Sequence, residues 1–293
     1  MDLEQSAFEA LRFASAQSLK LYKQPLVITY SGGKDSDVLL RLAENSGIPF
    51  EVLHSLTTAD APETVYHVRD TFRRMEEKGV KCAIDAHVQP DGKRVTMWNL
   101  IPQKLMPPTR LVRYCCAILK EGGGKGRFIA TGVRWDESAK RKKSRGLIEV
   151  QNKDVGKRLI LMNDNDETRM QFENCQMKGK RVVNPIIGWG NKEVWDYAET
   201  EKICMNPLYS LGFIRVGCIG CPMAGKCRKM EFVMYPKIRL AYIRAFDRML
   251  IERKIRCLQT YGLENGLDVF NWWMENGVLP GQEVLEEFRE DLL

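Results

Sequence analysis

The segment Ser31-Gly32-Gly33-Lys34-Asp35-Ser36 lies between two apolar stretches of different periodicity. Residues 26–30 favour a strand, and the apolar residues of 38–42 favour a helix. A glycine turn between a strand and a helix start suits a phosphate group, because backbone N–H groups and the helix dipole both attract an anion there. Gly32 and Gly33 permit a left-handed backbone and close approach of the anion. Lys34 adds positive charge, and Ser31 and Ser36 add hydroxyls, of which Ser36 can also cap the helix.

The composition predicts a globular protein. The 293 residues are 44% hydrophobic and 28% charged, and no apolar run approaches the length of a membrane-spanning helix. Residues 1–20 carry early acidic residues, so we expect an amphipathic helix there and no signal peptide. Nine cysteines without a secretion signal predict thiols or metal ligands in a cytoplasmic protein with no membrane contact. The net charge of +7 is compatible with a polyanionic partner but does not require one.

Strand and helix patterns alternate along the first two thirds of the chain. Further strand patterns cover residues 50–56, 82–88 and 128–133, and helical patterns lie between them. This alternation predicts an α/β fold with a doubly wound, mostly parallel sheet, in which ligands bind beyond the carboxyl ends of the strands. From about residue 230 the spacing becomes helical. We therefore expect a nucleotide-binding α/β domain over 1–215, and a CxxC segment with a helical subdomain over 216–293.

The cysteines form a second pattern. Cys115 and Cys116 are adjacent, Cys218 and Cys221 form a CxxC pair in a glycine-rich turn, and Cys227 follows six residues later. Four thiolates are the usual ligands of a [4Fe–4S] cluster or a structural zinc ion. Adjacent cysteines suit a cluster better than a zinc tetrahedron, because neighbouring side chains diverge. Zinc and simple burial of the thiols stay open, as does a role of Cys227 as a substitute ligand or a sulfur-handling thiol.

The S-G-G-K-D-S string differs from the Walker pattern and resembles the PP-loop of ATP pyrophosphatases, which cleave ATP between its α and β phosphates. Together with residues 58–64, 131–138, 184–189 and 206–209, it resembles the phosphoadenosine phosphosulfate (PAPS) reductase-like branch of these proteins. The resemblance runs from about residue 26 to residue 221 and implies an adenine nucleotide alpha hydrolase-like fold. The paired cysteines are similar to those of adenosine phosphosulfate (APS) reductases, which implies that Cys115, Cys116, Cys218 and Cys221 hold a [4Fe–4S] cluster.

One departure from the reductases concerns the C-terminal part of the sequence. Sulfonucleotide reductases carry a catalytic cysteine there in a Glu-Cys-Gly motif, whereas the last cysteine here is Cys257, followed by leucine. The ATP pyrophosphatases of DNA phosphorothioation, the Dnd and Ssp systems, are similar to this chain because they combine a PP-loop with cluster cysteines and lack that tail. Cluster-dependent tRNA thiolases share S-G-G-K-D-S but usually carry two CxxC pairs.

This resemblance implies an enzyme that converts ATP to AMP and pyrophosphate and so activates a nucleic-acid phosphate for sulfur transfer. It implies ATP, Mg²⁺ and the cluster as cofactors, and a cysteine desulfurase or other sulfur donor with modification-complex proteins as partners. Lys34, Asp35 and Arg134 are the expected catalytic residues. The expected nucleotide-binding residues are Ser31, Gly32, Gly33, Lys34, Asp35, Ser36, Asp60, Gly132 and Arg134.

Two further points stay open at this stage. The basic run from Lys140 to Arg145 is either a solvated face or a contact for DNA or another polyanion. The alternative functions are an APS or PAPS reductase that uses Cys257 or Cys227 as its nucleophile, a non-catalytic nucleotide- and cluster-binding adaptor, and an RNA-thiolating enzyme.

Overall fold

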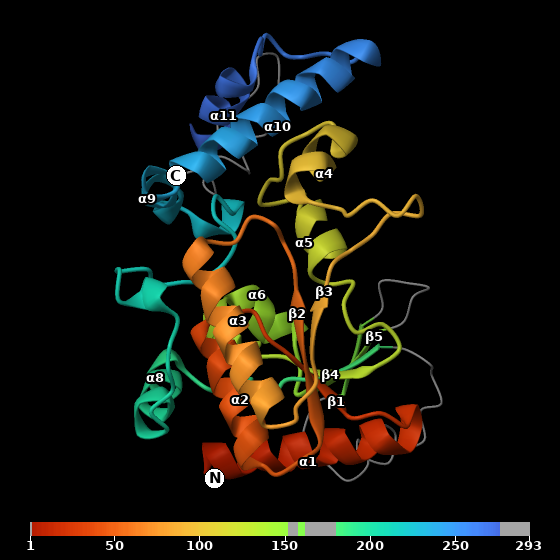
Figure 1. Ribbon diagram of the computed structural model, residues 1–293, viewed down its shortest axis with the longest axis vertical. Coiled ribbons are helices and arrows are strands. Elements are labelled where there is room, and N and C mark those ends of the chain that lie inside the picture. The colour runs from red at the N-terminus through yellow and green to blue at the C-terminus, as the bar shows by residue number, and fades with distance from the viewer. Residues whose placement is uncertain (1, 152–157, 162–179, 276–293) are drawn as a thin grey trace. The chain divides into compact units, whose positions relative to one another are not determined.

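The computed structural model describes residues 2–151, 158–161 and 180–275, which form two compact units (Figure 1). Unit 1 takes the described residues of 1–55, 62–85 and 122–216, and unit 2 takes 56–61, 86–121 and the described residues of 217–293. The sequence predicts a domain boundary after residue 215. This lies next to residue 216, after which the chain passes from unit 1 to unit 2 for the last time. Unit 2 also includes two earlier segments, and residues 276–293 of the expected second domain lie outside the described part.

The described part of unit 1 contains a seven-stranded sheet in the order β3-β2-β1-β4-β7-β5-β6. Neighbouring strands are parallel among β1 (Leu26–Thr29), β2 (Phe50–Ser55), β3 (Cys82–Asp85), β4 (Phe128–Ala130) and β7 (Lys180–Val183). The strand β5 (Ile148–Gln151) pairs antiparallel with both β7 and β6 (Arg158–Leu161). A mostly parallel sheet with flanking helices confirms the expected α/β class.

Alternate residues of the central strands point to opposite faces of the sheet, as the pleat requires. Leu26 and Ile28 of β1 join a large core with apolar residues of α1 (Leu3–Tyr22), α2 (Lys34–Asn45), α3 (Pro62–Glu77) and α8 (Asn191–Thr200). Val27 joins a smaller cluster with Ile129 and Val182. The strand that precedes the glycine turn is therefore buried on both faces, which positions the start of α2 against the core.

The described part of unit 2 is helical and contains an aromatic core. Its elements are α4 (Met97–Lys104), α5 (Tyr114–Leu119), η3 (Pro222–Ala224), α9 (Cys227–Met234), α10 (Pro236–Ile255) and α11 (Gly266–Glu275). The rings of this core pack with centroids 5.0–6.1 Å apart, within the favourable range for aromatic pairs; they belong to Phe232, Tyr242, Phe246, Phe270 and Trp273.

In the described part of the chain, no helix is both long enough and apolar enough to span a membrane.

Candidate functional site

The glycine turn after β1 adopts the left-handed backbone that the sequence predicts. Gly32 has φ +75°, and a Cβ atom there would lie 3.1 Å from Cγ2 of both Thr64 and Val68 on α3. Any larger residue would meet strain from the backbone and from these two side chains. The turn is therefore fixed between β1 and α3.

Hydrogen bonds of Ser36 close the turn onto the first turn of α2. Its hydroxyl donates to the Gly33 carbonyl oxygen at 2.7 Å and accepts the Gly33 N–H at 3.2 Å. The Ser31 hydroxyl donates to Ser36 Oγ at 3.3 Å. The N-cap of α2 is Gly33, and Ser36 lies at the third helical position. Ser36 contributes to capping as the sequence predicts, but from inside the first turn, because its side chain accepts the N–H of the N-cap residue.

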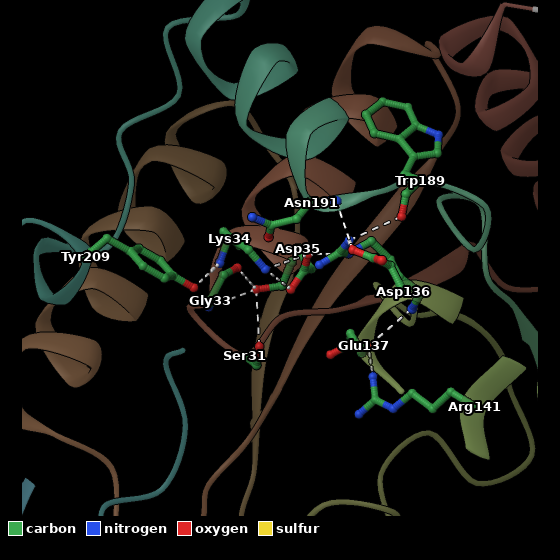
Figure 2. A network of polar contacts seen from close by, with 12 residues as sticks. Ser31, Gly33, Lys34, Asp35, Asp136, Glu137, Arg141, Trp189, Asn191 and Tyr209 are labelled. Atoms are coloured by element: carbon green, nitrogen blue, oxygen red, sulfur yellow. Dashed lines mark hydrogen bonds and ion pairs between the residues drawn. The ribbon is translucent and has the colours of Figure 1, made fainter. Parts of the chain in front are cut away.

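Two buried cations share one carboxylate beside this turn (Figure 2). Lys34 Nζ lies 3.0 and 3.2 Å from the two carboxylate oxygens of Asp35, and Arg134 Nε donates to Asp35 Oδ1 at 2.7 Å. Arg134 is 2% exposed and also donates to the Trp189 carbonyl oxygen at 3.2 Å. The two cations face the Asp35 carboxylate and the half-exposed Asp136 carboxylate, which lies 3.4 Å from Arg134 Nη1, so their charge is balanced in the free protein. Two fixed cations this close together can hold an anion that displaces a carboxylate.

The loop after β4 brings Arg134 to this position. A Cβ atom at Gly132 would lie 2.9 Å from the Asp35 carbonyl oxygen, so the absence of a side chain allows the two backbones to approach. The Arg134 N–H donates to Glu137 Oε2 at 3.2 Å, and Glu137 is paired with Arg141. Gly132 and Arg134 thus meet Asp35, which is far from both in sequence, within unit 1.

Further support comes from Asp136 in the short 3₁₀ helix η1 (Trp135–Glu137). Its Oδ2 lies 3.4 Å from Arg134 Nη1 and accepts the backbone N–H of Asn191 at 3.0 Å, at the start of α8 (Figure 2). The Arg134 loop is therefore tied to a second helix of unit 1.

Sequence reasoning missed the roles of Asn206 and Tyr209. Asn206 Nδ2 donates to the Gly32 carbonyl oxygen at 2.8 Å and to Thr64 Oγ1 at 3.2 Å. Tyr209 accepts the Lys34 N–H at 2.9 Å (Figure 2), so this amide does not point into open space as the turn alone predicts. The signal was the Asn-Pro-Leu-Tyr stretch, because asparagine before proline often opens a turn.

A buried carboxylate on α2 was also missed. Asp37 Oδ1 accepts a hydrogen bond of 2.5 Å from the Tyr30 hydroxyl and lies 3.0 Å from His67 Nε2 on α3. Burial, with the neighbouring Asp37 charge, raises the pKa of Tyr30 well above its usual value. These contacts tie the end of β1 and α3 to the first turns of α2.

The four cysteines expected at a cluster all belong to unit 2, on segments far apart in sequence. Cys115 and Cys116 lie on α5, whereas Cys218 and Cys221 precede η3. A hydrogen bond between the adjacent thiols lowers the pKa of Cys116 to about 6 and raises that of Cys115. Burial raises the pKa of Cys218, partly offset by the positive charge of Lys120.

Lys120 provides the counter-charge of this cysteine group. Its pKa is raised, first by Cys218 and then by Asp60, Cys116 and Cys221. Soft sulfur donors beside a fixed cation suit an anionic iron–sulfur cluster. Among the described residues, however, no three Cys, His, Asp or Glu side chains are arranged to hold a single metal ion. The four-ligand assignment stays a prediction.

Asp60, expected at the nucleotide, also belongs to unit 2. Its Oδ2 accepts a hydrogen bond of 2.6 Å from Thr57, and its backbone forms an antiparallel bridge with Cys218. Its expected contact with a nucleotide stays a prediction.

The basic run lies mainly on α6 (Ala139–Ser144), and at least two of its charges, those of Arg141 and Arg145, are paired within unit 1. Arg141 pairs with Glu137, and Arg145 Nη1 lies 3.1 Å from Oε2 of the fully buried Glu149. Lys142 and Lys143 are exposed. A longer basic stretch lies in unit 2, where residues 226–256 contain ten Lys and Arg against three Asp and Glu.

Residues 25–224 match the phosphoadenosine phosphosulfate reductase domain family. The chain belongs to this family. The match confirms the resemblance to PAPS reductase-like proteins, whereas the likeness to the Dnd and Ssp enzymes stays a prediction.

Individual relatives are more distant. An uncharacterised protein of Methanocaldococcus jannaschii is 28% identical over 68% of this chain and 36% of its own length. Sulfate adenylyltransferase subunit 2 of Rhodopseudomonas palustris is 28% identical over 71% of this chain and 60% of its own length. The match thus spans about a third to three fifths of these two curated relatives. The crystal structure of PAPS reductase from Candida auris is 18% identical with a TM-score of 0.45, covering 72% of this chain and 87% of that one.

Proposed function

We propose that this protein is an ATP pyrophosphatase that activates a nucleic-acid phosphate for sulfur insertion, as in DNA phosphorothioation. The observation that carries the proposal is the pair of buried cations, Lys34 and Arg134, held by Asp35 beside the turn that starts α2. Membership of the PAPS reductase domain family supports a nucleotide as the ligand of this turn.

The proposed reaction forms one bond to phosphorus and breaks another. An acceptor oxygen attacks the α phosphorus of ATP, and the bond to the oxygen that bridges the α and β phosphates breaks. Pyrophosphate leaves with that electron pair, and the acceptor becomes adenylated; if water is the acceptor, AMP forms. Negative charge grows on the departing pyrophosphate, where Lys34 and Arg134 stabilise it. A Mg²⁺ ion held near Asp35 would supply further charge neutralisation.

The second part of the proposal concerns sulfur. Cys115, Cys116, Cys218 and Cys221 would hold a [4Fe–4S] cluster with Lys120 as its counter-charge, and the cluster would supply sulfur or electron chemistry when bound. A cysteine desulfurase with a dithiol reductant, which supplies the two electrons that bring its persulfide sulfur to the sulfide level, or another donor of sulfide-level sulfur would deliver the sulfur atom. The sulfur would attack the phosphorus of the adenylated phosphate, the P–O bond to the adenylyl group would break, and AMP would leave with that electron pair.

The decisive experiment incubates anaerobically purified protein with ATP, Mg²⁺, duplex DNA and a sulfur donor. AMP and pyrophosphate in equal amounts, with phosphorothioate in the recovered DNA, are the expected products. A Lys34→Ala variant should lose this activity because the leaving pyrophosphate loses a charged partner. Release of ADP and phosphate, or no turnover under these conditions, contradicts the proposal.

The DNA contact is proposed at the exposed Lys142 and Lys143. A double Lys→Glu change there should weaken duplex binding, and the slope of log K against log salt should fall by about 0.9 for each phosphate that the variant no longer neutralises. The same change at Lys237 and Lys254 on α10 is the matched control. If only the α10 variant loses affinity, the polyanion contact belongs to the basic stretch at 226–256 instead.

Sulfonucleotide reduction is the second candidate, favoured by the grouped thiols and the family of the chain. It predicts sulfite from APS or PAPS with thioredoxin, and loss of that activity in Cys257→Ser or Cys227→Ser. An added arm with sulfate and ATP tests adenylyl transfer to sulfate, the activity in the name of the Rhodopseudomonas relative. Nucleotide affinity without turnover in all arms would indicate an adaptor.

A further inference from the structure

Tyr209 is held against the glycine turn by two separate contacts within unit 1. Asn206 caps the 3₁₀ helix η2 (Pro207–Tyr209) by accepting the Leu208 N–H at 3.0 Å, and its amide donates to the Gly32 carbonyl oxygen at 2.8 Å. The Tyr209 ring packs edge-on against Trp195 of α8, with centroids 5.1 Å apart and an interplanar angle of 88°. The phenol is therefore fixed from both its backbone and its ring.

The Tyr209 hydroxyl occupies the position where the first N–H of α2 would meet an anion. It accepts the Lys34 N–H at 2.9 Å, and a Cβ atom on Gly33 would lie 3.6 Å from it. A phenol hydroxyl can both accept and donate hydrogen bonds, and the Lys34 amide uses only its acceptor side. The remaining group is the O–H proton, which makes no hydrogen bond to a residue in the described part of the chain.

Burial raises the pKa of Tyr209, and the nearby Asp35 charge acts in the same direction. The hydroxyl therefore keeps its proton at neutral pH and remains a donor. Donation from the Lys34 amide polarises the O–H bond and strengthens the hydrogen bond that it makes. The Lys34 N–H at the start of α2 is used by the Tyr209 hydroxyl, and the O–H group of Tyr209 is the hydrogen-bond donor that remains at this position.

We propose that the Tyr209 hydroxyl donates a hydrogen bond to the pyrophosphate portion of ATP and determines the affinity of the loop for it. The inference rests on the proposed function, since that function places the pyrophosphate beside Lys34. It assigns to the Asn-Pro-Leu-Tyr stretch a direct part in binding the ligand, in addition to its part in packing.

The test is Tyr209→Phe, which keeps the ring and its contact with Trp195 and removes only the hydroxyl. Isothermal titration measures pyrophosphate, ATP and AMP binding to the full chain. We expect pyrophosphate and ATP affinity to fall about 10- to 100-fold, as for removal of a hydrogen bond to a charged group, with AMP affinity unchanged. The matched control is Tyr197→Phe, since Tyr197 lies on α8 and its hydroxyl contacts Asn45.

The outcomes separate this inference from the proposed function. Unchanged or tighter pyrophosphate binding by Tyr209→Phe overturns the inference, and so does an equal loss for AMP, which indicates a collapsed loop. Wild-type protein that binds pyrophosphate but releases none from ATP contradicts the proposed function alone. If the wild-type protein does not bind pyrophosphate, both are wrong.

Discussion

Replacing Asp35 by asparagine tests the charge balance of the loop directly. The change removes the carboxylate that faces Lys34 at 3.0 Å and Arg134 at 2.7 Å, whose side chains are only 10% and 3% exposed. Lys34 would then lose the counter-charge that Asp35 provides, and Arg134 would keep only the half-exposed Asp136 carboxylate at 3.4 Å. Breaking a buried ion pair by removing one partner costs about 3–5 kcal/mol. Because Asp35 itself is 22% exposed, we expect the lower end, about 3 kcal/mol.

The same change should strengthen anion binding, since an anion no longer competes with the carboxylate for the cations. Thermal unfolding is measured for wild type and Asp35→Asn, each with and without pyrophosphate and without Mg²⁺. We expect the variant to unfold roughly 6–12 °C lower than wild type when free. A tenfold gain in pyrophosphate affinity would restore about 1.4 kcal/mol at saturating ligand. ATP turnover should fall, because the cations and the metal lose their shared anchor.

Asp136→Asn is the matched control. Its carboxylate is 53% exposed and lies 3.4 Å from Arg134 Nη1, so its removal should cost less than about 1 kcal/mol. If both variants unfold at the same temperature, Asp35 does not neutralise buried charge. A smaller stabilisation of Asp35→Asn than of wild type by pyrophosphate would likewise refute the reasoning.

Three further changes test the remaining parts of the sites. Gly132→Ala should lower the free energy of unfolding by about 1–3 kcal/mol and weaken ATP binding, because its Cβ would lie 2.9 Å from the Asp35 carbonyl oxygen. Denaturant unfolding measures the loss, and Gly188→Ala, where the nearest atom lies at 4.0 Å, is the neutral control. Ser36→Ala should cost about 1 kcal/mol in the same assay by removing the cap of α2; an unchanged midpoint would contradict the capping role. Cys218→Ser should lower iron and sulfide per chain, whereas Cys204→Ser, at an exposed thiol, should not; equal iron content in both excludes Cys218 as a ligand.

The sequence was sufficient to predict what depends on local pattern. Alternating strands and helices predicted the parallel sheet, and the glycine turn predicted the left-handed backbone at Gly32. The Ser36 cap also follows from residues close in sequence. These features were accessible because short-range sterics and hydrogen bonding determine them, whatever the rest of the chain does.

The partners of the loop were not accessible in this way. Tyr209 contacts an amide 175 positions earlier in the chain, and Asn206 contacts a carbonyl 174 positions earlier, so no periodicity links them. The basic run illustrates the same limit, since counting charges does not reveal that Arg145 is paired with the buried Glu149. Unit 2 includes the short segments 56–61 and 86–121 through tertiary packing that no local pattern indicates.

The shared carboxylate also bears on which anions the loop selects. In the free protein the Asp35 carboxylate already contacts both Lys34 and Arg134. The net binding free energy of an incoming anion is therefore the difference between its own contacts with the two cations and those of Asp35 that it replaces. Hydrogen bonds to charged groups contribute about 1.5–3 kcal/mol each. A singly charged ligand that contacts one cation forms about as many such bonds as Asp35 loses, so its net gain in binding free energy is small. A pyrophosphate group has enough oxygens to contact both cations and the Tyr209 hydroxyl at once. If the proposed function and the proposed role of Tyr209 hold, we therefore expect the loop to bind polyphosphates in preference to small anions, because Asp35 competes with any ligand that contacts only one cation.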